Sequence, residues 1–324
     1  MDFLRFYGLR KDPFQLTPDP AFFYPSACHY EGLLLMDYSI EQKEGFLLVT
    51  GQPGTGKTTL LNVFLEHWRD RAETAIILTP RLSPEEFLTA VAEDLDINIG
   101  KKSKHNIIKA LRDFMVAKSS EGKRVIIIVD EAQNLPDETL EELRLLSNLE
   151  TENEKLLQII LSGQPELEAR LRTDNLRQLN QRISSRVYLR EFNREETLDY
   201  INHRLVMAGR KNLRAVQRRA RTGYKITKSI SALINNNTKK WRVHKKTGKA
   251  AHELTKGIPR LVNMLISRAL MAAYLEKSYY LLPRHIEHAL KSLNHSDMKP
   301  RKWGFLRPAF IRTALVVGML YIFL

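Results

Sequence analysis

The chain has 324 residues, of which 43% are hydrophobic and 27% charged, and this composition excludes an intrinsically disordered protein. Such a length is sufficient for two or three domains with packed cores. The formal net charge is +14, but Arg210 to Lys256 contains 15 Lys or Arg and a single acid, Glu253, while the rest of the chain is neutral. The charge therefore gives no general indication of a nucleic-acid-binding surface. With one cysteine, Cys28, an intrachain disulfide is excluded.

A phosphate-binding loop is the first clear motif in chain order. Residues 46–50, FLLVT, have the length and apolarity of a buried strand, GQPGTGKT follows, and TLLNVFLEHW then has helical spacing of apolar residues. This is the G-x-x-x-x-G-K-[ST] pattern in its strand–loop–helix context, in which backbone N–H groups and a lysine bind phosphate oxygens. The predicted nucleotide-binding residues are Gly51, Gln52, Pro53, Gly54, Thr55, Gly56, Lys57, Thr58 and Thr59.

A second motif supplies two carboxylates. Residues 125–129 are continuously apolar, as in a parallel strand buried on both faces, and Asp130 and Glu131 follow directly. We expect Asp130 and the Thr58 hydroxyl to hold Mg²⁺ and Glu131 to activate the attacking water. Together with the loop, this pair predicts a Mg²⁺-dependent ATP hydrolase.

Two further strands are predicted at 75–79, AIILT, and 156–162, LLQIILS. Strands that alternate with helices favour an α/β fold with a parallel sheet. Ser162 and Gln164 at the end of the later strand are expected beside the phosphate motifs. Gln164 is the preferred candidate for contacting the γ-phosphate or the water, and a simple polar strand cap is the alternative.

A pair of arginines follows in LRQLNQRISSRVYL. Arg182 and Arg186 are predicted to share one helix face that leads into the strand VYL. From there, one of them, preferably Arg182, could reach the nucleotide of a neighbouring subunit and stabilise transition-state charge. The alternative is a pair of ion pairs within their own domain.

The stretch from 211 to 250 differs from its surroundings. Residues 217–249 contain eleven Lys or Arg and no acid, with no sustained helical stripe of apolar residues, and a lid-like pattern resumes at HELTKGIPRL. Three explanations are open: an insertion that binds DNA or anionic lipid, a solvated loop without a partner, or a stretch translated out of frame. We assign no site residues to it.

The last residues, 313–324, are TALVVGMLYIFL, preceded by a basic cluster. Twelve residues of helix span about 18 Å, less than the roughly 30 Å of a bilayer core. We expect a membrane-seeking tail or a partial transmembrane segment, and a helix docked on the core is the alternative.

Several long motifs in this order resemble those of the AAA+ ATPases. Three stretches are more specifically similar to the general secretion pathway protein A group and the MSHA pilus biogenesis protein M group. They are FYGLRKDPFQLTPDPAFFYPSACHYEGLLLM, DEAQNLPDETLEELRLLSNLETENEKLLQIILSGQPEL and GIPRLVNMLISRALMAAY. The resemblance extends over residues 3–210 and 251–293, and NLETENEKLLQ favours the pilus members.

The resemblance implies a P-loop AAA+ parallel sheet flanked by helices and followed by a small α-helical lid. The implied organisation is an adenine-pocket arm at 1–40, a nucleotide-binding domain at 41–192, a lid at 193–295 that includes the anomalous segment, a basic linker at 296–312, and the tail at 313–324. In this family Arg260 of GIPR contacts the nucleotide phosphates. Pro13, Phe14, Phe23 and Tyr24 are candidates for the adenine pocket, with apolar packing of the arm as an equal alternative.

The resemblance further implies a function and partners. The implied function is that of an ATPase at the cytoplasmic face of the inner membrane, acting in secretion or type IV pilus assembly. The implied partners are the proteins of those machines and further copies of the chain in a homo-oligomer, for which a hexamer is considered. ATP and Mg²⁺ are the expected cofactors. The alternative is a DNA-transaction ATPase of the transposition target-selection type; nucleic acid is therefore a considered but not favoured partner.

Overall fold

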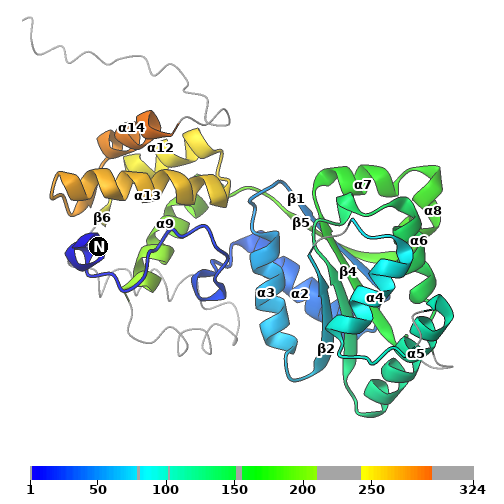
Figure 1. The fold of residues 1–324 in the computed structure, drawn as a ribbon. Helices are drawn as coiled ribbons and strands as arrows, with labels where there is room; N and C mark the ends of the chain where they lie inside the picture. Colours follow the sequence, from blue (N-terminus) through cyan, green and yellow to red (C-terminus); the bar gives the residue numbers. More distant parts are fainter. Residues whose placement is uncertain (1, 79–80, 101–102, 151–154, 210–241, 294–324) are drawn as a thin grey trace, which may run out of the picture. The chain divides into compact units, whose positions relative to one another are not determined.

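The computed structural model describes residues 2–78, 81–100, 103–150, 155–209 and 242–293 (Figure 1). Most of the anomalous basic segment, the expected linker at 296–312 and the expected tail at 313–324 lie outside these residues. Among the residues that are described, no helix is both long enough and apolar enough to span a bilayer.

Five parallel strands form the main sheet, in the spatial order β2-β3-β4-β1-β5. The strands are β1 (Phe46–Gly51), β2 (Ala72–Ile77), β3 (Arg124–Val129), β4 (Leu157–Gly163) and β5 (Ile183–Leu189). The predicted α/β class and parallel sheet are confirmed. The strand expected at 75–79 instead starts at Ala72, because polar Glu73 and Thr74 pair with Val125 and Ile126 of β3.

Helices cover both faces of this sheet, as expected when parallel strands are joined by crossover connections. On one face, α2 (Ala27–Glu41) and α3 (Lys57–Trp68) pack on residues such as Leu47 and Ile128. The other face packs against a second set of helices. These are α4 (Pro84–Asp94), α5 (Lys104–Ser120), α6 (Asp137–Leu146), α7 (Pro165–Leu171) and α8 (Arg177–Arg182). Since successive side chains of a strand point to opposite faces and both faces are covered, β1 and β4 are buried throughout and β3 is buried from Val125 onwards.

A helical region follows β5. It contains α9 (Arg194–Ala208), α12 (Lys245–Thr255), α13 (Pro259–Leu275) and α14 (Pro283–Ser292), together with the two-residue strands β6 (Arg242–Val243) and β7 (Tyr280–Leu281). We call this region, residues 194–209 and 242–293, the lid. Figure 1 shows α12, α13 and α14 packed together.

Residues 242–250, the part of the basic segment that the structure describes, belong to the lid. Arg242 pairs with Tyr280, and the Thr247 hydroxyl donates to the carbonyl of Leu281 at 2.8 Å. The lid-like sequence pattern resumes at HELTK, whereas the helix that contains it, α12, already begins at Lys245. Its buried face consists of small residues such as Gly248 and Ala251, and a Cβ at Gly248 would lie 2.8 Å from Leu198. Because α12 packs through small side chains, the spacing of large apolar residues in the sequence gives no indication of it.

The N-terminal arm packs mainly on the lid. In α1 (Asp2–Tyr7), the Tyr7 hydroxyl donates to the carbonyls of Leu270 and Ser278 at 3.2 and 3.1 Å. The backbone N–H of Arg10 donates to the carbonyl of Ala208 at 2.9 Å. The chain then passes through a short 3₁₀ turn, η1 (Pro20–Phe22), and reaches the sheet region as α2.

Candidate functional site

Asp130 links three elements at the carboxyl ends of the strands. Its Oδ2 accepts a hydrogen bond of 2.7 Å from the Thr58 hydroxyl of α3, and its Oδ1 accepts one of 2.8 Å from the Ser162 hydroxyl of β4. The Asp130 side chain is buried. Parallel strands end at the same sheet edge, so the strand order places these three residues together. The two predicted metal ligands, Thr58 and Asp130, are therefore adjacent.

Glu131, the next residue, has a left-handed backbone with φ of 51°. Its N–H donates to Asp130 Oδ1 at 3.0 Å, and its Oε2 accepts from Gln164 Nε2 at 3.2 Å and from Gln133 Nε2 at 2.5 Å. A non-glycine residue in this conformation has an energetic cost of about 1–2 kcal/mol, and such residues often mark functional sites. The structure thus brings Gln164 to Glu131, and a role of Gln164 beside the water or the γ-phosphate stays a prediction.

Lys57 lies inside the predicted phosphate loop. Its ammonium donates to the carbonyl of Gly51 at 2.8 Å and to that of Gln52 at 3.3 Å. Burial lowers the pKa of Lys57, while the charges of Glu131 and Asp130 act in the opposite direction. In the rest of the loop, Thr55 donates through its hydroxyl to the Gln52 carbonyl at 2.8 Å.

The other predicted loop residues are more accessible. Gln52 and Pro53 are exposed, and Thr58 and Thr59 at the start of α3 are partly buried. Lys57 and Thr58 form the first turn of that helix, where free N–H groups and the helix dipole favour an anion. The loop can therefore accept the phosphates of a nucleotide.

The lid contacts this loop at Gly54. The N–H of Arg260, in the first turn of α13, donates to the Gly54 carbonyl at 3.2 Å. Gly54 has φ of 82°, and a Cβ there would lie 2.7 Å from the Cβ of Arg260. Glycine is required at this position both by the backbone conformation and by the close approach of the lid. Arg260 itself is exposed beside the loop.

The two predicted finger arginines do not share a helix face. Arg182 is the last residue of α8, whereas Arg186 lies in β5, whose residues alternate between buried and more exposed. The prediction of one helix is wrong because ISSRVYL has a period of two rather than 3.6. Arg186 Nη2 donates to Asn180 Oδ1 at 2.6 Å, and its Nη1 lies 4.0 Å from Glu168. Arg182 Nη1 donates only weakly, at 3.5 Å, to the Ser147 hydroxyl.

His29 of α2 is a site residue that the motifs did not indicate. Its Nε2 donates to the Thr55 carbonyl of the phosphate loop at 3.0 Å, and the Ser26 hydroxyl donates to its Nδ1 at 2.7 Å. Burial lowers its pKa to about 4, so the imidazole is neutral at physiological pH. Only the tertiary packing of α2 on the loop reveals this contact. A buried histidine in the sequence YPSACHYEG gives no local signal.

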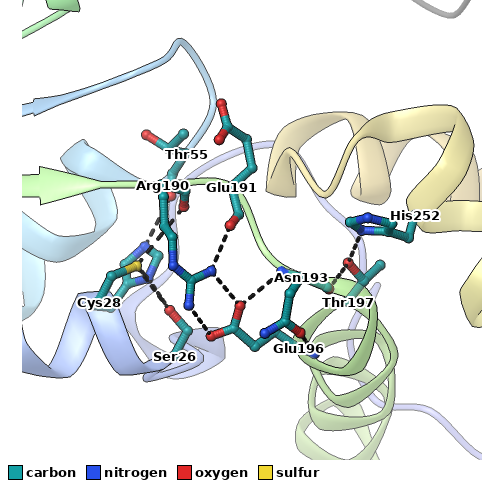
Figure 2. Close-up of polar contacts among 10 residues, drawn as sticks. Ser26, Cys28, Thr55, Arg190, Glu191, Asn193, Glu196, Thr197 and His252 are labelled. Atoms are coloured by element: carbon teal, nitrogen blue, oxygen red, sulfur yellow. Dashed lines mark hydrogen bonds and ion pairs between the residues drawn. The ribbon is translucent and has the colours of Figure 1, made fainter.

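The connection between β5 and the lid is held by charged side chains (Figure 2). Arg190 contacts the carboxylate of Glu196 with both terminal nitrogens, at 2.7 and 3.0 Å, and donates to the carbonyl of Glu191 at 2.9 Å. Glu196 also accepts from the N–H of Asn193 at 2.9 Å, which completes the capping box of α9. The N–H of Phe192 donates to the Gly257 carbonyl at 3.0 Å. These contacts fix where the lid begins.

Phe14 and Tyr24 are packed against the lid, whereas Phe23 packs on His29 and on the sheet face covered by α2 and α3. Arg204 of α9 donates to the carbonyl of Pro13, and its guanidinium lies over the ring of Phe14, which is almost fully buried. Tyr24 makes ring contacts with Phe192 and other aromatic side chains. Their assignment to an adenine pocket stays a prediction.

A protein-family comparison matches residues 40–171 to an AAA domain. General secretion pathway protein A of Aeromonas hydrophila is 34% identical to this chain over 281 residues, which are 86% of this chain and 46% of that protein. ATP-dependent target DNA activator B of Escherichia phage Mu is 37% identical over 105 residues, 32% of this chain and 31% of that protein. The chain thus spans less than half the length of either curated relative.

Two solved structures share the fold. The CDC6P protein of Pyrobaculum aerophilum has a TM-score of 0.58 with 15% identity, over 85% of this chain and 71% of that one. The ORC2 protein of Aeropyrum pernix, in ADPNP–ADP complexes, has a TM-score of 0.56 with 12% identity, over 82% and 66%. At these identities the likeness supports the architecture alone, namely a parallel sheet flanked by helices and followed by a helical part.

Proposed function

We propose that this chain, an AAA+ protein of the general secretion pathway protein A type, binds and hydrolyses ATP and couples the hydrolysis to movement of its lid. The observation that carries the proposal is the convergence of Thr58, Asp130 and Glu131 at one sheet edge beside the phosphate loop. Carboxylates joined directly to the loop in this way are what phosphoryl transfer to water needs.

In this mechanism the loop N–H groups and Lys57 bind the β- and γ-phosphates. Glu131 orients a water and takes one of its protons as the water oxygen attacks the γ-phosphorus. The bond between that phosphorus and the oxygen bridging to the β-phosphate breaks, and the electron pair leaves with ADP. Gln164, which contacts Glu131, would contact the water or the γ-phosphate.

The residues at the predicted metal site fit Mg²⁺. The Thr58 hydroxyl and Asp130 carboxylate are hard oxygen ligands on adjacent elements, and Mg²⁺ is usually bound by few protein oxygens together with phosphates. When bound, the ion would neutralise phosphate charge and align the γ-phosphoryl group. Ser162 would keep the Asp130 carboxylate in place through its hydrogen bond to Oδ1.

The lid and a second subunit complete the proposal. Arg260 is already at the mouth of the phosphate loop and would contact the phosphates as the lid closes. Among the residues that the structure describes, Arg182 makes only a long hydrogen bond, to Ser147, and it remains the preferred candidate for a finger in trans, which requires a homo-oligomer. The Arg186 side chain contacts Asn180 and lies near Glu168, which favours a structural role.

For the cellular role, we propose an assembly ATPase of protein secretion or of type IV pilus biogenesis at the inner membrane. Similarity over 86% of the chain to General secretion pathway protein A supports secretion. The pilus assignment rests on the amino-acid sequence of the central motif, NLETENEKLLQ. The alternative is a DNA-transaction ATPase, which the shorter similarity to the phage target DNA activator supports.

Steady-state hydrolysis by the purified chain and by Glu131→Gln tests the enzymatic proposal. The wild type is expected to release phosphate in a Mg²⁺-dependent reaction, and the variant to lose about 10²–10⁴-fold in kcat while retaining nucleotide binding. Equal rates for the two proteins would contradict the role of Glu131. Adding duplex DNA or anionic vesicles separates the cellular roles, because stimulation by DNA alone would favour the alternative.

A further inference from the structure

Among the described residues, Gln133 makes the shortest side-chain hydrogen bond to the Glu131 carboxylate. It lies in η2 (Ala132–Asn134), the 3₁₀ turn that follows Glu131, and its Nε2 donates to Glu131 Oε2 at 2.5 Å. None of the sequence motifs assigns a role to Gln133. Its contact is shorter than that of Gln164 with the same oxygen, 3.2 Å.

The orientation of the Gln133 amide is fixed by a neighbour that can only donate. The backbone N–H of Gln164 donates to Gln133 Oε1 at 3.1 Å. Since a backbone N–H cannot accept, the amide oxygen must face β4 and the amide nitrogen must face Glu131. The side chains of Glu131 and Gln133, together with the backbone N–H and side chain of Gln164, therefore form a closed ring of three hydrogen bonds, which we call the amide ring.

The turn that carries Gln133 is itself anchored. Arg170 of α7 donates to the Gln133 carbonyl at 2.6 Å and to the Leu135 carbonyl at 3.0 Å, and it also contacts Asp137. These bonds tie η2 to the helix that follows β4. Glu131 is thus held from two sides, although its backbone has a conformation that non-glycine residues rarely adopt.

The amide ring also selects which carboxylate oxygen is engaged. Both amides contact Oε2, and within the described part of the chain neither contacts Oε1. A carboxylate fixed through one oxygen has its other oxygen in a defined direction, which is the condition for accepting a proton from a positioned water.

We propose that Gln133 is a positioning residue for ATP hydrolysis: it holds the Glu131 carboxylate in one orientation and links it to the end of β4 through Gln164. The inference rests on the proposed role of Glu131 as the base. It predicts that Gln133 contributes to the rate of the chemical step and not to the binding of nucleotide, because it does not belong to the phosphate loop.

The test replaces Gln133 by methionine, which preserves the volume and removes both hydrogen bonds. Because Gln133 donates a hydrogen bond to a charged carboxylate, we expect its loss to lower kcat about tenfold. KM, the affinity for a fluorescent ATP analogue and the melting temperature should stay at their wild-type values. Asn134→Ala, at an exposed position in the same turn, is the matched control and should be fully active.

Two further variants distinguish the loss of the amide ring from a failure to fold. Gln133→Asn retains an amide that is one methylene too short to bridge Glu131 and Gln164, and it should show the same loss if methionine prevents folding. In the double variant Gln133→Met/Gln164→Met, the losses should not multiply, because each single change already opens the amide ring.

The result that overturns the inference is a Gln133 variant with wild-type kcat, or one whose loss appears in KM or in the melting temperature. This failure is distinguishable from failure of the proposed function. If the wild type turns over ATP and Glu131→Gln does not, the proposed function stands whatever Gln133 does. If the wild type has no turnover, both are wrong.

Discussion

The sheet edge and the lid contribute to the candidate site in different ways. At the sheet edge, side chains bond to side chains from other elements, as in the contacts of Asp130 with Thr58 and Ser162. On the lid side, the contact with the phosphate loop runs through the backbone N–H of Arg260. In the proposed mechanism, the groups for chemistry would therefore be assembled within the sheet, while the lid would adjust how the nucleotide is enclosed.

The largest expected effect tests the sheet side. Lys57→Met removes the buried cation of the phosphate loop, and we expect hydrolysis to fall about 10³-fold, in line with the loss of an electrostatic contact to the transferring phosphoryl group. Phosphate release assays measure this. Lys11→Met, at an exposed surface position, is the control. A variant that keeps a tenth of the activity would mean that the loop does not hold the phosphates.

The next prediction concerns the attachment of the lid. Gly257 has φ of 77°, and a Cβ there would lie 1.9 Å from the Phe192 carbonyl oxygen. Gly257→Ala should therefore destabilise the chain by about 3 kcal/mol, from the left-handed conformation and the displacement of the connection. Urea unfolding measures the change. Gly100→Ala, where a Cβ meets no atom within 4 Å, should be nearly neutral.

A smaller effect depends on pH at the contact between α2 and the phosphate loop. The pKa of His29 is lowered from 6.5 to about 4, so the unfolded chain binds the proton more readily than the folded one. Stability should then be fully present above pH 6.5 and decrease as the pH falls towards 4. Between pH 7 and pH 5 the histidine contributes a loss of about 2 kcal/mol.

Comparison with His29→Gln isolates this contribution. The amide can still donate towards Thr55 but does not titrate, so its unfolding free energy should depend less on pH than that of the wild type. Parallel curves for wild type and His29→Gln would contradict the neutral buried imidazole.

The smallest expected effect tests the lid side of the comparison. Arg260→Ala should weaken binding of a fluorescent ATP analogue about tenfold, the value of one charge-assisted contact with phosphate. Arg268→Ala, exposed further along α13, is the control. If Arg260→Ala reduced turnover as strongly as Lys57→Met, the lid would belong to the chemical apparatus and the distinction between the two regions would be lost.

The sequence predicted the sheet side well because its signals are local. Apolar runs followed by Lys57, Asp130 and Gln164 give both the strand and the residue at its end, and parallel strands place those ends together. The residues that the sequence did not reveal, His29 and Gln133, act through contacts between elements, for which periodicity has no signal. Arg186 was placed on a helix because spacing of four was given more weight than the alternation of ISSRVYL.

The lid was harder to predict for a compositional reason. Its helix α12 buries threonine, glycine and alanine, and its exposed positions carry lysine, so the sequence shows no helical stripe of large apolar residues there. The buried Arg204, which holds the arm through the Pro13 carbonyl, likewise has no motif.

The packing of the N-terminal arm on the lid has a consequence for motion. A body joined to another by one flexible segment can turn about any axis through that joint. The lid is joined to the sheet region twice, by the residues after Leu189 and by the arm that passes through η1 into α2. Two attachment points restrict rotation mainly to the axis that joins them. In the proposed mechanism, lid movement coupled to nucleotide binding would therefore follow this one axis.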